Sequence, residues 1–133
     1  MTLTEYTIER FERLDVDPAR FDHAAHIYVA RLFLAHYPER EAIDRFSRAL
    51  RRLTLAAGAP EKYHATITGF YLRTIARRMA TRPDDSWASF RSRNADLFDG
   101  SSLQAGYSTQ RLASAAARRR FLEPDLDSTA TGA

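Results

Sequence analysis

The chain has 133 residues, a length that suits one domain. It contains no cysteine, which excludes disulfides, thiolate metal sites and a cysteine nucleophile. The formal net charge is +3, and because acidic residues are interspersed among the arginines, this balance argues against a nucleic-acid partner. The chain starts without the apolar core of a secretory signal, and no run approaches the ~20 apolar residues of a membrane span. We therefore expect a cytoplasmic protein that makes no membrane contact.

The first two predicted elements are helices. Residues 3–14 carry an apolar stripe at helical spacing, and the turn-forming residues 15–18 end this helix. A second helix is predicted to begin near Asp22, a good N-cap residue, and to end at about His36. It ends there because the residue before Pro38 is disfavoured in helical geometry.

The next two predicted elements are longer helices. Residues 39–57 keep a helical period of apolar residues, with most arginines on the other face, and Gly58 is a natural C-terminal stop. A fourth helix is predicted from Pro60 or Glu61 to Ala80, because proline suits the first turn of a helix.

The C-terminal third is predicted to hold two shorter helices, at 86–95 and 108–121. Small and polar residues follow, so we expect 123–133 to be an irregular or disordered tail behind a single helical domain of residues 1–122. Because the predicted loops are short, sequential helices should be antiparallel neighbours. The expected fold is all-α, a compact bundle of five to six helices.

All four histidines lie between positions 23 and 64. His23 and His26 are three residues apart, a spacing that places both rings on one face of a helix. His64 lies near the start of the predicted fourth helix, which can meet the second helix in a bundle. His36 is more than two turns away from His26, so it should not join the same centre.

A group of three imidazoles supports two kinds of chemistry. Neutral imidazole is a common ligand of zinc, iron or copper, so His23, His26 and His64 form a candidate site for a divalent transition metal. Without a metal, one histidine could act as a general base in a pocket between helices. Arg31 or Arg73 could then hold an anionic substrate. The predicted substrate-binding residues around the histidines are Tyr63, Thr66, Thr68 and Tyr71.

Two strings of residues are typical of a known group of sequences. Phe21–His26 reads F-x-H-x-x-H, and Lys62–Thr68 reads K-Y-H-x-T-I-T. With a later echo between Tyr107 and Leu126, they resemble a group of small uncharacterised bacterial helical proteins. The resemblance covers about two thirds of the chain and implies that His23, His26, His64, Thr66 and Thr68 belong to a recurrent pattern, without assigning an activity. This chain departs from the pattern at Ala65, where an acidic residue is more usual.

The function expected from these features is binding of a metal ion or small molecule in a histidine-lined pocket, and the sequence leaves open whether the protein is an enzyme. The chain has no Gly-rich phosphate loop and no H-E-x-x-H motif. The alternative is a non-catalytic protein-interaction module in which the histidines are structural. A homo-oligomer is left open by the sequence. The arginine run 118–120 is explained by a solvated helix face.

Overall fold

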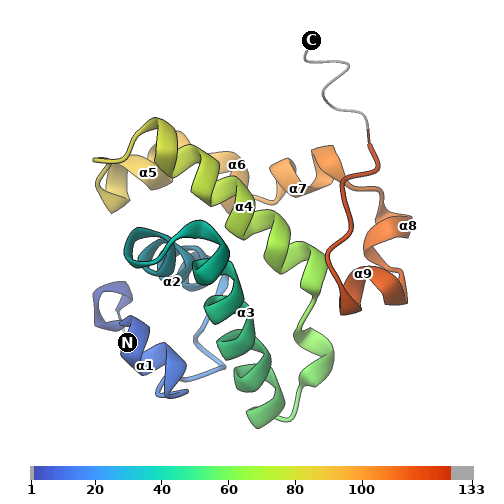
Figure 1. The fold of residues 1–133 in the computed structure, drawn as a ribbon, viewed down its shortest axis with the longest axis horizontal. Coiled ribbons are helices and arrows are strands. Elements are labelled where there is room, and N and C mark those ends of the chain that lie inside the picture. The colour runs from blue at the N-terminus through green and yellow to red at the C-terminus, as the bar shows by residue number, and fades with distance from the viewer. Residues whose placement is uncertain (1, 127–133) are drawn as a thin grey trace.

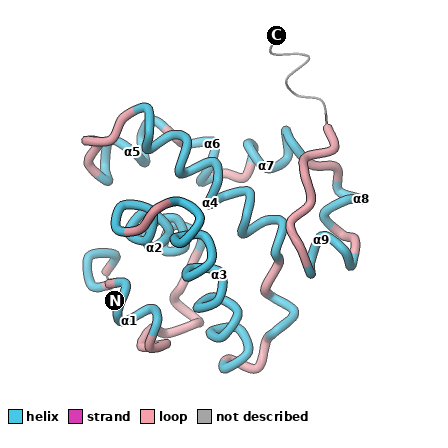
Figure 2. Tube along the Cα trace, viewed as in Figure 1, coloured by secondary structure: helices cyan, strands magenta, loops and turns pink. Residues whose placement is uncertain are grey.

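The computed structural model describes residues 2–126, and every regular element in that range is a helix (Figures 1 and 2). The elements in chain order are η1 (Leu3–Glu5), α1 (Ile8–Glu12), α2 (His23–His36), α3 (Glu39–Ala56), η2 (Pro60–Lys62), α4 (Ala65–Thr81), α5 (Trp87–Arg93), α6 (Ala95–Phe98), α7 (Ser101–Gly106), α8 (Thr109–Leu112) and α9 (Ala115–Arg119), where η denotes a 3-10 helix. The longest are α2, α3 and α4, of 14, 18 and 17 residues.

The prediction of an all-α protein is confirmed, but a bundle of five to six helices is not, because residues 2–126 form nine α-helices and two 3-10 helices. The predicted first, fifth and last helices are each divided. Thr7 and Ser114 each accept a hydrogen bond from the backbone three residues on, so each begins a new helix inside a predicted one. Asn94 leaves helical geometry between α5 and α6, and its side chain donates to the carbonyl of Phe90 at 2.7 Å.

Helix α2 has the boundaries that its sequence predicts. The carboxylate of Asp22 accepts from the amide of Ala25 at 2.9 Å and caps the N-terminus. The helix ends where Tyr37 turns to an extended conformation (φ −125°, ψ 153°) before Pro38. The Asp22 cap positions both histidines of the first turn, because it fixes where the helix starts.

Helix α3 is amphipathic, and its apolar face is buried. Phe46 on that face is 3% exposed and stacks on Phe11 with ring centroids 5.2 Å apart. On the polar face, Arg45 makes a two-pronged ion pair with Glu12, with N–O distances of 3.0 and 2.8 Å. The helix stops before Gly58, whose φ of +73° is readily adopted only by glycine.

The three long helices pack against one another and enclose the main core, and α1 packs on α2 and α3 (Figure 1). Helix α4 runs across the molecule, with α2 and α3 on one side, and it also contacts α7 and α9. Within residues 2–126, no helix is long and apolar enough to cross a membrane.

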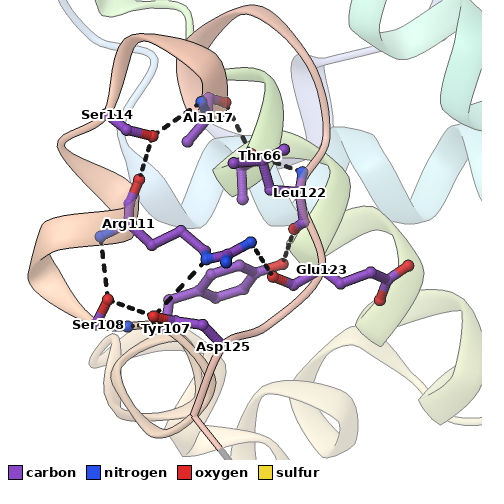
Figure 3. Close-up of polar contacts among 9 residues, drawn as sticks. All are labelled: Thr66, Tyr107, Ser108, Arg111, Ser114, Ala117, Leu122, Glu123 and Asp125. Atoms are coloured by element: carbon purple, nitrogen blue, oxygen red, sulfur yellow. Dashed lines mark hydrogen bonds and ion pairs between the residues drawn. The ribbon is translucent and has the colours of Figure 1, made fainter.

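The C-terminal segment folds back onto the body of the protein through polar contacts (Figure 3). The hydroxyl of Tyr107 donates to the carbonyl of Leu122 at 2.7 Å. The carboxylate of Asp125 accepts from both the amide and the hydroxyl of Ser108, at 2.8 and 2.5 Å. Residues 121–126 are irregular, and these bonds hold them in place. The rest of the predicted tail, 127–133, lies outside the described residues.

The same segment explains the only glycine inside α4. A Cβ atom added at Gly69 would lie 2.6 Å from Cδ1 of Phe121, the residue that opens the returning segment. A normal carbon–carbon contact is roughly 3.5–4.0 Å, so any side chain here would displace the ring. Gly69 therefore allows the Phe121 ring to lie close against the helix, where the Arg73 guanidinium covers the ring at 3.9 Å from its centroid.

Candidate functional site

A cavity of about 370 Å³ lies between α2, α3 and α4. Its volume falls within the range of about 300–1,000 Å³ that is typical of small-molecule sites. All three of the predicted metal ligands line it. The lining residues are His23, His26, Ile27, Ala30, Phe46, Leu50, Lys62, His64, Ile67, Thr68, Tyr71, Leu72, Ile75 and Leu103.

Most of this wall is apolar and is part of the protein core. Ile27 and Leu72 are each 1% exposed, and Ile75 is fully buried. No aspartate or glutamate is among the lining residues of the described chain, and Lys62 supplies the lining's only ammonium or guanidinium group. The cavity therefore combines an apolar interior with a small set of polar groups, the usual composition of a ligand site.

His64 is engaged at both ring nitrogens. Nδ1 accepts from the amide of Ile67 at 3.1 Å, so the ring caps the N-terminus of α4, which begins at Ala65 rather than at Pro60 or Glu61. Nε2 donates to the carbonyl of Leu112 at 2.7 Å. Both bonds are satisfied by the neutral tautomer that carries its proton on Nε2. In this arrangement His64 offers no lone pair to a metal ion or a substrate.

His26 keeps one ring nitrogen available. Nδ1 lies 2.8 Å from the carbonyl of Asp22, which can only accept, so Nδ1 carries the proton and Nε2 carries a lone pair. Burial lowers the pKa of His26, and this effect outweighs the opposing effect of the bond to the Asp22 carbonyl, while the neighbouring His23 lowers the pKa by a smaller amount. The neutral ring is therefore favoured, and it presents a hydrogen-bond acceptor to the cavity it lines.

His23 lies at the mouth of the cavity and is exposed. Its Nε2 donates to the carbonyl of Leu97 at 2.7 Å, which joins α2 to α6. Its ring meets Tyr71 edge to face, with centroids 5.0 Å apart. The Nδ1 atom makes no hydrogen bond with any residue of the described chain.

His23, His26 and His64 all line this one cavity, but binding of a single metal ion also requires their ring nitrogens to lie close together. Ligand nitrogens of zinc lie about 2 Å from the metal. Among residues 2–126, no three or more His, Asp or Glu side chains are grouped closely enough to hold one ion. A three-histidine centre would require His64 to give up its bond with the Ile67 amide, because Nδ1 is the ring nitrogen that carries no proton.

Two of the four predicted substrate-binding residues line the cavity. Thr68 and Tyr71 are one turn apart on α4, and neither hydroxyl is bonded to another described residue. Burial raises the pKa of the Tyr71 phenol, with smaller contributions from Asp99 and Asp96, so the phenol remains a hydrogen-bond donor.

The structure places the other two predicted substrate-binding residues elsewhere. Thr66 is fully buried, its hydroxyl donates to Ala117 at 2.7 Å, and it accepts from the amide of Leu122 at 3.0 Å (Figure 3). Tyr63 lies under the Arg51 guanidinium, 5.4 Å from its ring centroid, and lines a separate surface depression. Both residues are therefore assigned to packing rather than to the cavity.

The two arginines suggested as anion-binding groups are also outside the cavity. Arg31 donates to the carbonyl of Asp85 at 2.9 Å and covers the ring of Phe90. Arg73 covers Phe121 on the other side of α4. His36, which was expected to stand apart from the other histidines, lies at the end of α2 and outside the lining.

A second, wider chamber adjoins the first. Its volume is about 860 Å³, and we call it the outer chamber and the cavity between α2, α3 and α4 the inner chamber. The residues that line both are His26, Leu50, Lys62, His64 and Ile67. Lys62 thus lies at the junction of the two chambers, and its ammonium group forms no ion pair within residues 2–126.

Sequence reasoning missed Lys62 and the apolar walls as parts of the site. Lys62 is the only lysine of the chain and begins the K-Y-H string, so its proximity to His64 was a usable signal. Ile27, Leu72 and Ile75 were indistinguishable from ordinary core residues, because a cavity wall and a filled core carry the same apolar pattern.

In comparisons with known proteins, no family model matched the chain, and no significant match was found among curated proteins or solved structures. The candidate site therefore stands on its own geometry.

Proposed function

We propose that this protein binds a small molecule in the cavity between α2, α3 and α4. The observation that carries the proposal is the composition of that cavity, an apolar chamber of about 370 Å³ whose polar groups come from three elements. His26, Thr68 and Tyr71 each offer a group that is free of hydrogen bonds to other described residues. Such groups orient a ligand, while the apolar wall supplies most of the binding free energy.

The catalytic form of the proposal assigns the proton-accepting role to His26. Its proton is held on Nδ1 by the carbonyl of Asp22, which leaves Nε2 as the basic atom. Burial lowers its pKa, so the ring is neutral and ready to accept a proton at neutral pH. Tyr71 supports this role as a donor that could stabilise charge developing on a substrate oxygen.

A neutral fluorescent probe, N-phenyl-1-naphthylamine, tests the proposal. We expect saturable binding by the natural protein and at least a tenfold weaker affinity in Thr68→Phe, because the added ring occupies the cavity. Thr109→Phe is the matched control, since Thr109 is exposed on α8 and outside the lining. Ala30→Leu fills the cavity from the opposite helix, so it provides a second test of the proposal if Thr68→Phe does not fold.

Weak, non-saturable fluorescence that is the same in all four proteins would contradict the proposal. That outcome would instead favour a non-catalytic interaction module with structural histidines. Circular dichroism of each variant establishes that the comparison is made between folded proteins.

A transition-metal ion such as zinc, iron or copper is the second candidate occupant. It is favoured by His23 and His26, each of which keeps one ring nitrogen outside the hydrogen bonds of the described chain. Calorimetric titration of zinc into protein without a histidine tag tests it. Stoichiometric binding that is lost in His26→Ala supports a metal site, and an absence of binding at micromolar zinc contradicts it.

A further inference from the structure

The charges around the two chambers restrict what can bind there. The inner chamber has Lys62 as its cationic group and no carboxylate among its lining residues in the described chain. The outer chamber adds Arg118 and one carboxylate, Glu61. An organic cation would meet Lys62 without a compensating acid in the inner chamber, whereas an anion would meet the opposite charge.

The hydrogen-bonding groups point in the same direction. Lys62 offers three donors, and the hydroxyls of Thr68 and Tyr71 each offer one. His64 contributes none, because its Nε2–H is already donated to Leu112. Thr68 and Tyr71 line only the inner chamber, so Lys62 is the donor that meets a charged group at the junction, where its ammonium suits a carboxylate or similar group.

The position of the charge suggests how the ligand is oriented. Lys62 lies where the two chambers meet, while the inner chamber ends in the apolar side chains of Ile27, Leu72 and Ile75. An apolar body inserted into the inner chamber would leave its charged end at the junction. Lys62 is itself exposed, so that end keeps access to water, which limits the cost of burying a charge.

We propose that the occupant is an amphipathic monoanion, a molecule with an apolar body of about ten non-hydrogen atoms and one carboxylate-like group held at Lys62. This inference rests on the proposed function, since it names the ligand class of the same cavity. Lys62 is a binding and specificity residue in this account, and it takes no part in any bond-breaking step.

Three probes of equal chain length test the ligand class: octanoate, octan-1-ol and octylammonium. Each is titrated against the complex of the protein with N-phenyl-1-naphthylamine at pH 7.5, below the concentration at which it forms micelles. We expect octanoate to displace the probe most effectively, with octylammonium weaker by about tenfold. Direct calorimetry with octanoate establishes that displacement reflects binding.

Variants of Lys62 test the residue assignment. Lys62→Gln should reduce octanoate affinity about fivefold and leave octan-1-ol unchanged, because an exposed ion pair contributes modestly. Lys62→Arg should retain most of the preference for octanoate. Arg119→Gln is the matched control, since Arg119 is an exposed cation outside both chambers.

The outcomes separate the two proposals. If all three probes bind alike, or if Lys62→Gln leaves the preference for octanoate intact, the ligand class is wrong while the cavity remains a binding site. If neither the fluorescent probe nor octanoate binds, both the ligand class and the proposed function are wrong. A preference for octylammonium would likewise overturn the inference.

Discussion

The ring of His64 joins two distant parts of the chain through Leu112. Its Nε2 donates to the Leu112 carbonyl at 2.7 Å, while Nδ1 caps helix α4 on the amide of Ile67. One buried imidazole therefore fixes the start of α4 and holds α8 beside it. The same ring is part of the cavity wall, so the C-terminal region and the candidate site share a structural element.

Replacing His64 should cost stability in two separable parts. His64→Ala removes both the N-cap and the bond to Leu112, and we expect a loss of about 2–3 kcal/mol in the free energy of unfolding. His64→Asn keeps an N-cap acceptor but is too short to reach Leu112, so its loss should be about half as large. Urea denaturation measures both.

The control for these variants is His36→Ala, because His36 is exposed and its bond to Leu32 is long, at 3.3 Å. It should change stability by less than about 0.5 kcal/mol. Equal losses of stability in His64→Ala and His36→Ala would show that the two hydrogen bonds of the His64 ring do not stabilise the fold.

The buried hydroxyl of Thr66 should hold the C-terminal segment in place. In Thr66→Val, the carbonyl of Ala117 and the amide of Leu122 lose their partner, at a cost of about 1–3 kcal/mol. Amide hydrogen exchange at Leu122 should accelerate more than exchange within α3. Thr74→Val is the matched control on the same helix, because the hydroxyl of Thr74 makes only one long contact within residues 2–126, of 3.4 Å, with Arg77.

Exchange at Leu122 that is unchanged in Thr66→Val would mean that other contacts fix the segment. Tyr107 and Asp125 provide such contacts in the structure, so the comparison measures the share carried by Thr66.

Gly69→Ala should destabilise the protein although alanine is the better helix former. In an open helix this change would stabilise by about 1 kcal/mol, but here the new methyl group meets the ring of Phe121. Thermal denaturation should show a lower melting temperature. In a Phe121→Ala background the same substitution should become neutral or stabilising, and a double-mutant cycle measures the difference. A single variant that is more stable than the natural protein would contradict the account.

The lowered pKa of His26 predicts a loss of stability in acid. Its ordinary pKa is 6.5, and the folded state holds it lower, so the unfolded chain binds the proton more readily than the folded chain. This contribution to stability is present at pH 7.5 and is lost as the pH falls below 6.5 toward the folded-state pKa. Urea denaturation at pH 7.5 and 5.0 should show a smaller acid loss in His26→Gln than in the natural protein. An identical acid loss in both would contradict the assignment.

The sequence predicted the long helices well because their signals are local. Asp22 and Pro38 bound α2, and Gly58 follows α3, as capping and turn preferences require. It was less successful where two signals compete. Ser114 was read as the interior of one helix, yet its side chain starts a new one. His64 was likewise read as the interior of a helix, yet its side chain starts α4. Histidine is an uncommon N-cap, and the ring is also held by the distant Leu112.

The site was predictable in part for the same reason. The three-residue spacing of His23 and His26 places both on the cavity, and Thr68 and Tyr71 follow from the period of α4. Thr66 could not be separated from Thr68 by sequence, because both belong to one string and only tertiary packing turns Thr66 toward the returning segment. The free or occupied state of each ring nitrogen depends on long-range carbonyls, which no local pattern encodes.

The central claim is that a ligand occupies the cavity beside the free nitrogen of His26. Nitrogen-15 NMR of the imidazole rings, recorded with and without saturating octanoate, tests it most directly. The account predicts that the Nε2 resonance of His26 shifts on binding, while His64 keeps its proton on Nε2 in both states. Binding of octanoate that leaves the His26 resonances unchanged would place the ligand elsewhere and contradict the account.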